Sequence, residues 1–333
     1  MKFSLVIPLA PSRDAPILET IKQLDYPKNE FHVVVVKGFN PSENRNKGSE
    51  KSHGEIIAFL DDDALIEKNY LKEAEKFFRE HPEIDILGGP QLSPLDEKGF
   101  AKVSGYALTS KFGAWDVAHR YSLRDEKLNA DESMITSANL LCRKSVMDKI
   151  KFNVNFFPGE DPKFIEDAKK VGLRVAYSPK IIVYHKRRPT VKLFMKQMFN
   201  YGKTRPFKEP FSQTLGMPFF LIPSAFLIYL ILLGILTGTN FSLTGNAVNS
   251  NYWIFKNISN FSWIFAAPFF AYLALNLAFS LYESSKNNHK ASFIPLLGIF
   301  PMLHLSYGYG MIWGYVKKNF TDKNVSSEYG KKK

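Results

Sequence analysis

Over its first 205 residues, the chain alternates short apolar runs with segments of helical periodicity. Three of the runs are continuously apolar and rich in β-branched residues, which predicts strands buried on both faces: 4–8, 31–36 and 55–60. Residues 15–23 and 69–78 instead gather their apolar side chains on one side of a helix. Strands and helices in alternation favour a mainly parallel sheet covered by helices. We therefore expect an α/β, Rossmann-like domain over residues 1–189.

The pattern changes at residue 217, where long uncharged apolar stretches begin. Three of them approach the ~20 residues that cross a bilayer as a helix: 218–238, 262–282 and 293–316. The third contains Pro295, Gly298 and Pro301, so it is expected to be kinked or re-entrant. We expect a transmembrane helical region over residues 211–318 and a basic tail over 319–333.

An amphipathic segment connects the two regions. In residues 190–203, apolar side chains recur at helical spacing, and mainly lysine and amide side chains occupy the other side. Such a helix either lies on a membrane surface or packs as an ordinary surface helix. We expect an interfacial helix and linker over 190–210.

Composition and charge indicate where in the cell the protein is located. The chain of 333 residues carries a formal net charge of +12 and a single cysteine, Cys142, which excludes an intramolecular disulfide and fits a reducing compartment. Pro8 breaks the first apolar run too early for a signal peptide. We expect a multi-pass protein of the cell membrane with a cytoplasmic first domain. Its charge suits membrane lipids or phosphate-bearing substrates, and we expect no nucleic-acid partner because no recognition module is found.

The basic tail conflicts with three crossings. A cytoplasmic domain followed by three spans would put the tail outside, whereas lysine-rich segments normally stay inside. A re-entrant third segment would remove the conflict.

Three adjacent carboxylates, Asp61, Asp62 and Asp63, directly follow the third buried strand. Ligands of open α/β sheets bind at the carboxyl ends of strands. Carboxylate oxygens suit Mg²⁺ or Mn²⁺, which often also hold a substrate phosphate. The triplet therefore predicts a metal–phosphate site, and the alternative is an acidic turn or helix start.

Several motifs follow one another along residues 2–205: Val6-Ile7-Pro8, Asn44-Arg45-Asn46-Lys47-Gly48, the run from Gly54 to Asp63, Ser137-Ala138-Asn139, Arg143, Gly159-Glu160-Asp161 and Val183-Tyr184-His185. In this order they resemble a family 2 glycosyltransferase of GT-A fold. The stretch from His185 to Lys203, followed by apolar segments, resembles the membrane-attached members that build bacterial exopolysaccharides of the succinoglycan type.

The resemblance implies a nucleotide-sugar donor and a divalent metal, Mg²⁺ or Mn²⁺. Asp63 would bind the metal, and Asp61 or Asp62 would touch the ribose or the metal's water. Pro8 and Asn46 would lie on the donor side. Asp161 matches the general base that takes the proton of the acceptor hydroxyl, in a single displacement with inversion at C1. Without the resemblance, Glu160 and Asp161 would be interpreted as an acidic helix N-terminus.

Further residues are candidates for the diphosphate and acceptor region: Asn139, Glu160, Arg187, Lys203 and Arg205. His185 is a candidate for a further metal ligand or a diphosphate contact. The alternative for the basic residues is a positive run beside the membrane that sets topology or anchors to lipid head groups.

One departure from the family pattern concerns the donor. Family members commonly carry an acid after the second strand, where it contacts the nucleotide base, but here Lys37-Gly38-Phe39 follows. The base is therefore left open, with a UDP-sugar as the first expectation.

We expect a membrane-bound inverting glycosyltransferase acting on a lipid-linked or polysaccharide hydroxyl. The alternatives are a polyprenyl-phosphate glycosyltransferase, in which the acceptor is already an anion, and a non-catalytic membrane scaffold with the same fold. A channel or transporter is disfavoured because the three apolar stretches lack the buried charges of an ion path, and His304 is the one residue in them that carries a charge near neutral pH.

Overall fold

The computed structural model describes residues 1–156, 158–208, 211–244, 252–287 and 293–330, with the backbone alone for 236–244, 252–264 and 319–330. The chain forms two compact units, Met1–Val191 and Lys192–Lys333.

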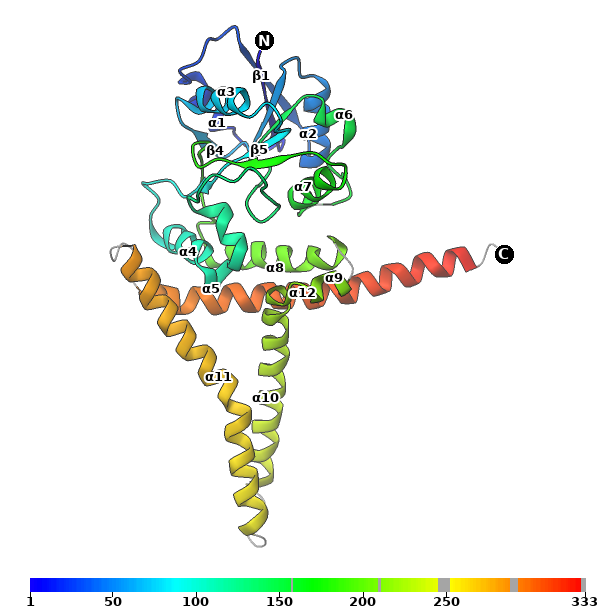
Figure 1. The fold of residues 1–333 in the computed structure, drawn as a ribbon. Coiled ribbons are helices and arrows are strands. Elements are labelled where there is room, and N and C mark those ends of the chain that lie inside the picture. Colours follow the sequence, from blue (N-terminus) through cyan, green and yellow to red (C-terminus); the bar gives the residue numbers. More distant parts are fainter. Residues whose placement is uncertain (157, 209–210, 245–251, 288–292, 331–333) are drawn as a thin grey trace. The chain divides into compact units, whose positions relative to one another are not determined.

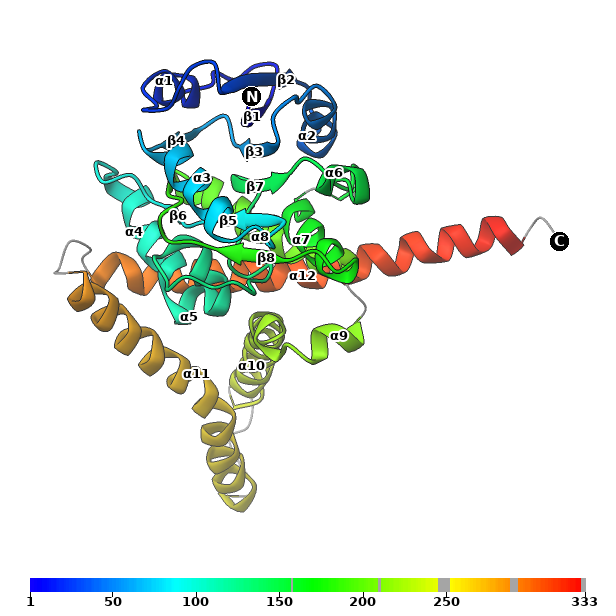
Figure 2. The same ribbon diagram turned by 45° about the horizontal axis from the view of Figure 1, so that its top comes forward.

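The first unit is built on a six-stranded sheet with the order β2-β1-β3-β7-β5-β8, which can be followed in Figure 2. Its strands are β1 (Phe3–Leu9), β2 (Phe31–Lys37), β3 (Ile56–Leu60), β5 (Ile86–Gly88), β7 (Asn139–Arg143) and β8 (Val175–Tyr177). All neighbouring strands are parallel except β7, which runs antiparallel to both β3 and β5. The prediction of a mainly parallel α/β sheet is confirmed.

A second, three-stranded sheet lies beside the ends of the first. It has the order β4-β9-β6, from β4 (Ala64–Ile66), β9 (Val183–His185) and β6 (Gln91–Leu92). The antiparallel pairing of β4 with β9 sets Ala64 opposite His185. This register brings a histidine from far along the chain next to the acidic triplet.

Helices cover both faces of the large sheet (Figure 1). One apolar core joins β1 and β3 to α1 (Ile17–Lys22) and α3 (Tyr70–Glu80), and the other joins the opposite strand face to α6 (Val146–Lys149) and α7 (Glu160–Lys170). Phe3, Leu5 and Ile7 enter the first core, whereas Val6 enters the second. This alternation is why the strand is apolar at every position.

The other helices of this unit are α2 (Pro41–Glu50), α4 (Gly99–Thr109), α5 (Lys111–Ala114) and the 3₁₀ helix η1 (Trp115–Tyr121). In α2, proline stands at the first position and the Asn40 side chain accepts a hydrogen bond from the Glu43 amide at 3.1 Å. Both features are strong helix-start signals, and they fix where Arg45 faces.

The second unit is helical. It contains α8 (Val191–Lys208), α9 (Phe211–Leu215), η2 (Pro218–Phe220), α10 (Ile222–Thr244), α11 (Tyr252–Lys286) and α12 (Phe293–Gly330). Within this unit, α12 crosses α10, as Figure 1 shows. The third apolar stretch is one continuous helix with Pro301 inside it, so the structure shows no re-entrant turn there.

Glycines allow α12 to approach its neighbours closely. A Cβ on Gly310 would lie 2.0 Å from the Phe199 carbonyl oxygen of α8, and one on Gly314 would lie 2.3 Å from the Lys203 carbonyl oxygen. Gly308 meets α10 in the same way, and its carbonyl accepts from the Ser224 hydroxyl at 3.2 Å. Backbone-to-backbone packing of this kind needs residues without side chains.

Two prolines lie inside continuous helices of this unit, and side chains of neighbouring helices bond to backbone groups beside them. Pro301 cannot donate to the Leu297 carbonyl, which accepts instead from the Asn276 side chain of α11 at 2.9 Å. Beside Pro268, the Tyr229 hydroxyl of α10 donates to the Phe265 carbonyl at 2.6 Å and accepts from the Phe269 amide at 3.2 Å. The protein itself thus satisfies groups that a water-exposed helix would leave to solvent.

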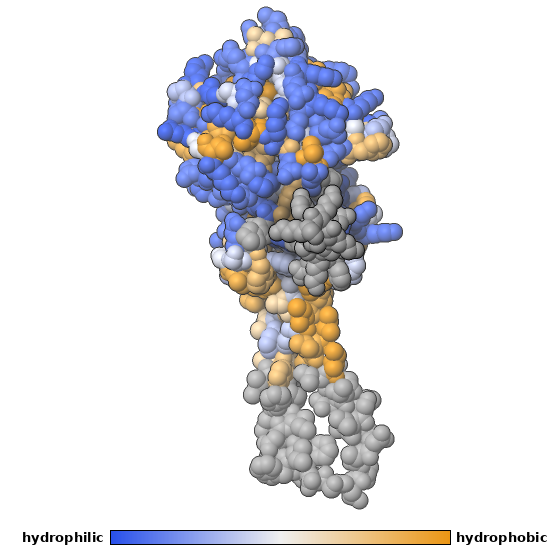
Figure 3. Space-filling model, turned by 90° about the vertical axis from the view of Figure 1, so that its right-hand side faces the viewer, coloured by the Kyte–Doolittle hydropathy of each residue, from blue (hydrophilic) through white to orange (hydrophobic). Residues whose placement is uncertain are grey.

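Among the described residues, one helical segment is long and apolar enough to cross a membrane, Phe265–Lys286 in α11. Ile222–Ile235 of α10 is apolar over a shorter length, and α12 does not meet the same measure. By length and composition, the described residues therefore support one of the three expected membrane crossings. Apolar side chains nevertheless gather on the described surface of this unit, whereas the α/β domain is mostly hydrophilic (Figure 3).

Candidate active site

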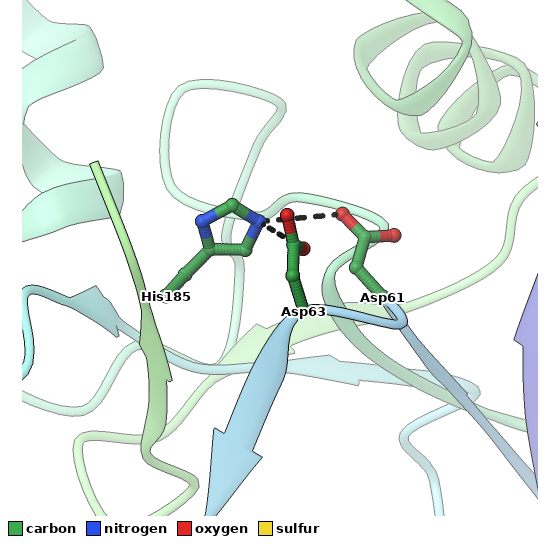
Figure 4. A group of neighbouring side chains, drawn as sticks. All are labelled: Asp61, Asp63 and His185. Carbon is green, nitrogen blue, oxygen red and sulfur yellow. Dashed lines mark ion pairs between the residues drawn. The ribbon is translucent and has the colours of Figure 1, made fainter. Parts of the chain in front are cut away.

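The acidic triplet occupies the turn between β3 and β4, at the carboxyl end of a buried strand. His185 Nε2 lies 2.8 Å from Asp63 Oδ1 and 3.9 Å from Asp61 Oδ2 (Figure 4). One ligand atom from each of the three residues lies within 4.8 Å of the others. Two carboxylates and an imidazole at this spacing are a donor set for one divalent cation.

Asp61 thus joins Asp63 in the candidate metal cluster, while Asp62 faces elsewhere. The Asp62 side chain is buried and lies 3.2 Å from Arg13 Nη2, which is also 2.5 Å from Asp63 Oδ2. Arg13 lies in the turn after β1, and its guanidinium balances two of the three carboxylates. Its partnership with the triplet could not be predicted from the pattern of the chain, because fifty residues separate Arg13 from Asp63.

The three carboxylates differ in electrostatics. Burial raises the pKa of Asp62 to about 6, despite the charge of Arg13. Burial would also raise the pKa of Asp63, but the hydrogen bond and charge of His185, together with Arg13, hold that pKa well below its usual value. Asp63 therefore stays ionised over the whole physiological range, as a metal ligand must.

Arg45 connects the triplet to a second acidic pair. Its side chain is only 3% exposed, and it donates through Nη2 to Asp61 Oδ1 and through Nη1 to Glu160 Oε1, each at 2.8 Å. The guanidinium also lies over the Phe152 ring, 5.4 Å from its centroid. The planar guanidinium binds the two carboxylates through different nitrogens and so fixes the distance between them. The single ammonium group of a lysine would not fix this distance.

Glu160 and Asp161 open α7. The preceding Gly159 has φ +114°, a left-handed conformation that suits glycine, and its amide donates to Glu160 Oε2 at 3.0 Å. Burial raises the pKa of Glu160, although Arg45 opposes this. Asp161 Oδ2 lies 3.9 Å from Nη1 of Arg120, a residue of η1 that also donates through Nε to the Glu132 carbonyl at 3.1 Å.

The structure therefore brings the triplet and the Glu160–Asp161 pair into one continuous network through Arg45. Arg45 belongs to the motif Asn44-Arg45-Asn46-Lys47-Gly48, but the family resemblance implied no role for it. Arg120 carried no signal, because its contact with Asp161 depends on the path of the segment that follows α5.

Other candidates are engaged in the fold itself. Pro8 is buried in β1. The Asn46 amide donates to and accepts from the Phe152 backbone at 2.8 and 3.0 Å. Asn139 is fully buried, accepts from the Tyr70 hydroxyl at 2.8 Å and donates to the Ile181 carbonyl at 2.7 Å. These contacts give both asparagines a positioning role. The donor-side role of Asn46 and the diphosphate or acceptor role of Asn139 stay predictions.

Arg187, another candidate for the diphosphate and acceptor region, is also held by contacts within the fold. It donates through Nη2 to the Gln91 carbonyl at 2.5 Å and through Nε to the Ser93 hydroxyl at 3.0 Å, and its guanidinium lies 4.6 Å from the Tyr121 ring centroid. It thereby fastens η1 to β9, which carries His185. Lys203 and Arg205 belong to the second unit, in which the Arg205 guanidinium lies over the Phe220 ring. Their reach to a diphosphate stays a prediction.

Comparison with known proteins identifies the class. The sequence model described as glycosyltransferase like family 2 matches residues 2–202, so the chain belongs to glycosyltransferase family 2. The resemblance to this family is confirmed, whereas nothing specific to the exopolysaccharide-building subgroup is found.

Individual relatives are more distant. The chain is 29% identical to the poly(ribitol-phosphate) β-N-acetylglucosaminyltransferase TarS of Staphylococcus aureus over 24% of its own length, and it spans 19% of that protein. A crystal structure of TarS residues 1–349 with UDP is 19% identical, with a TM-score of 0.43 over 60% of this chain and 64% of that one.

The mannosyltransferase PcManGT of Pyrobaculum calidifontis, solved with GDP-mannose and Mn²⁺, has a TM-score of 0.51 at 14% identity. The alignment covers 94% of this chain and 87% of that one. At this identity the likeness concerns the fold.

Proposed function

We propose that this protein is a metal-dependent, inverting glycosyltransferase that moves a sugar from a nucleotide donor to an acceptor hydroxyl at a membrane. One observation carries the proposal: Arg45 joins a three-ligand metal cluster to the helix start that bears Asp161. A leaving diphosphate and an attacking hydroxyl need these two sites next to each other.

The cluster fits a divalent cation. Asp61, Asp63 and His185 would hold it, since their ligand atoms already converge and Asp63 stays ionised. Mn²⁺ or Mg²⁺ suits a set of two carboxylates and one imidazole. When bound, the cation would neutralise the negative charge that develops on the leaving diphosphate.

Asp161 is the candidate general base. It stands at the first turn of α7, beside a buried Glu160 that Arg45 holds in place. Arg120 Nη1 lies 3.9 Å from the Asp161 carboxylate, which is the group that would accept the proton of the attacking hydroxyl. Attack from the side opposite the leaving group inverts the configuration at C1.

The helical unit supports membrane attachment. Large apolar side chains are exposed on both α10 and α11: Ile228, Ile231, Leu232, Ile235, Phe270, Leu273, Leu277 and Leu281. Tyr229 and Asn276 satisfy the backbone groups beside the two prolines internally, as a medium without water requires. Hydrocarbon is the surrounding that suits both features.

We further propose that α10 and α11 form a membrane-inserted hairpin and that α12 does not cross. Two crossings return the chain to the side on which it entered. The basic tail, together with Lys317 and Lys318 directly before it, then stays on the side of the catalytic domain, where lysine-rich segments are favoured. A compartment-sensitive reporter at the C-terminus tests this, and a signal from the outer compartment would refute it.

The donor is tested with a panel of UDP-, GDP- and dTDP-sugars. Purified protein in lipid nanodiscs is expected to hydrolyse at least one of them slowly in Mn²⁺, with water replacing the acceptor. We expect a UDP-sugar to be the preferred donor. If no sugar nucleotide is bound or hydrolysed, the chain is a scaffold of the same fold.

Asp161→Asn separates the two kinds of acceptor. With a hydroxyl acceptor, loss of the base is expected to lower kcat by about 10²–10⁴-fold. A phosphate acceptor is already an anion, so substantial activity would remain and favour a polyprenyl-phosphate glycosyltransferase. Asp167→Asn, a change in the same helix at a residue paired with Lys163, is the matched control.

A further inference from the structure

Arg13 is the half-open member of the charge network around the acidic triplet. Its Nη2 lies 2.5 Å from Asp63 Oδ2 and 3.2 Å from Asp62 Oδ1, and no other contact of the guanidinium is found among the residues that the structure describes. The side chain is 47% exposed, whereas that of Arg45 is 3% exposed. A guanidinium also carries N–H donors on Nε and Nη1, and in Arg13 these remain available to a ligand.

The backbone around Arg13 is fixed beside the triplet. Residues 10–13 form a turn in which the Arg13 amide donates to the Ala10 carbonyl at 3.0 Å, and Pro11 stands at the turn position that proline favours. Further along, the Ile17 amide donates to the Asp62 carbonyl at 3.3 Å. The segment that carries Arg13 is therefore anchored at both ends, by its own turn and by the loop of the triplet.

The Asp63 carboxylate separates Arg13 from the candidate cation site. Asp63 Oδ1 lies 2.8 Å from His185 Nε2 (Figure 4), whereas Asp63 Oδ2 faces Arg13. A cation held by Asp61, Asp63 and His185 would therefore share one carboxylate with the guanidinium. A ligand with two linked phosphate groups can contact both positive groups at once.

The charge of the site makes Arg13 necessary for an anionic ligand. When ionised, the triplet and Glu160 supply four negative charges, and Arg13 and Arg45 supply two positive charges. A divalent cation brings this group to neutrality. Without Arg13, the metal-loaded site would keep a net negative charge, which would repel an incoming diphosphate.

Neutralising carboxylates does not require an open guanidinium. Arg45 shows the form that pairing alone takes in this unit, since its side chain is buried and two of its nitrogens donate to carboxylates. Arg13 uses one nitrogen for both of its carboxylates and leaves the side chain half exposed. An arginine with open donors beside a cation site is suited to bind a phosphate oxygen.

We propose that Arg13 binds the leaving diphosphate of the donor alongside the cation, while it stays paired with Asp63. This binding role rests on the proposed function. In the transfer step, the acceptor oxygen forms its bond to C1, its proton passes to Asp161, and the electron pair of the broken bond remains on the diphosphate. The negative charge on the diphosphate therefore grows, and a charge-assisted hydrogen bond from Arg13 strengthens as the reaction proceeds.

The test compares binding of nucleoside diphosphates with binding of the metal. Wild type and variants in lipid nanodiscs are titrated with UDP, GDP and dTDP at saturating Mn²⁺, and binding of Mn²⁺ alone is followed by electron paramagnetic resonance. Arg13→Met is expected to lower the affinity for the diphosphate that the wild type binds most tightly by about 10- to 100-fold. Its affinity for Mn²⁺ should not fall, because the substitution removes a positive charge beside the metal ligands.

Two further variants complete the test. Arg13→Gln keeps a polar group at the triplet but lacks the charge, so its affinities should change as in Arg13→Met. It also replaces Arg13→Met if circular dichroism shows that the latter does not fold. Arg79→Met removes an exposed arginine of α3 and should change neither affinity.

Two results would overturn this binding role. If Arg13 serves only to neutralise the triplet, the variants will bind Mn²⁺ more tightly and the diphosphate as tightly as the wild type does. If Arg13 serves only to hold the metal ligands in place, the affinities for Mn²⁺ and for the diphosphate will fall together. A wild type that binds none of the three diphosphates in Mn²⁺ would instead refute the proposed function, so the two failures are distinguishable.

Discussion

The two units satisfy polar groups for opposite reasons. In the α/β unit, the buried Arg45 forms ion pairs with two carboxylates, one of which belongs to the candidate metal cluster. In the helical unit, the half-buried Tyr229 and the buried Asn276 form hydrogen bonds with the backbone beside prolines, and large apolar side chains are exposed on the same helices. A buried charge network preorganises a reaction, whereas neutral donors that satisfy backbone groups allow a helix to leave water.

The contrast is the one that the proposed membrane surroundings of the helical unit would require. A domain in water can expose its charges, so a charge that it buries at high cost must be paired. A helix in hydrocarbon has the reverse problem, because any unpaired amide or carbonyl is expensive there. Substitutions in the two units should therefore differ in size and in their dependence on the medium.

The largest effect is expected from Arg45→Met. The substitution leaves Asp61 and Glu160 without their shared cation, and breaking such a buried network costs about 3–5 kcal/mol. For a unit of this size, Tm should fall by about 10 °C, as followed by circular dichroism. Arg45→Lys should lose less, and Arg79→Met, at an exposed position of α3, should be neutral. An unchanged Tm for Arg45→Met would show that the ion pairs of Arg45 do not stabilise the first unit.

Metal binding should stabilise the first unit alone. At a Mn²⁺ concentration one hundred times its Kd, the folded form gains about 2.7 kcal/mol, and EDTA should reverse the gain. Asp63→Ala should abolish this response, whereas Asp148→Ala, an exposed carboxylate on α6, should keep it. A full response in Asp63→Ala would place the ion elsewhere.

Two glycine substitutions in the helical unit should have opposite signs. In Gly310→Ala, the new methyl would lie 2.0 Å from the Phe199 carbonyl oxygen, and forcing α8 and α12 apart should cost about 1–3 kcal/mol. In Gly234→Ala, no described atom lies within 4 Å of the new methyl, and the better helix former should stabilise by up to about 1 kcal/mol. Thermal unfolding in detergent measures both. Equal effects would mean that α8 and α12 are not closely packed.

The smallest effect is expected from the proline-associated donors. Asn276→Leu leaves the Leu297 carbonyl without its partner, and interhelical hydrogen bonds in membranes are worth about 0.6 kcal/mol on average. Tyr229→Phe should behave alike, and Tyr282→Phe, at an exposed tyrosine of α11, serves as the control. The loss should be larger in nanodiscs than in a solubilising mixture that admits water. If the loss of stability is the same in both media, these hydrogen bonds do not serve to keep the helices in hydrocarbon.

The family and the α/β class could be predicted well from the sequence. Continuous apolar strands, the acidic triplet at a strand end and the order of the motifs are local features, and each follows from neighbouring residues. The antiparallel course of β7 could not be predicted in this way, since a short buried strand has the same pattern in either direction. Nor could the single long α12, because a proline-interrupted apolar stretch is compatible with a break or with a helix that neighbours repair.

The sequence by itself determined which chemical groups are available: three carboxylates after a strand, an acidic pair at a helix start, and apolar stretches rich in proline and glycine. Tertiary structure alone decided which of them meet. The β4–β9 register brings His185 to Asp63, and the path of α2 sets Arg45 between Asp61 and Glu160. Contacts between residues more than a hundred positions apart depend on how the whole chain packs, and no local pattern encodes them.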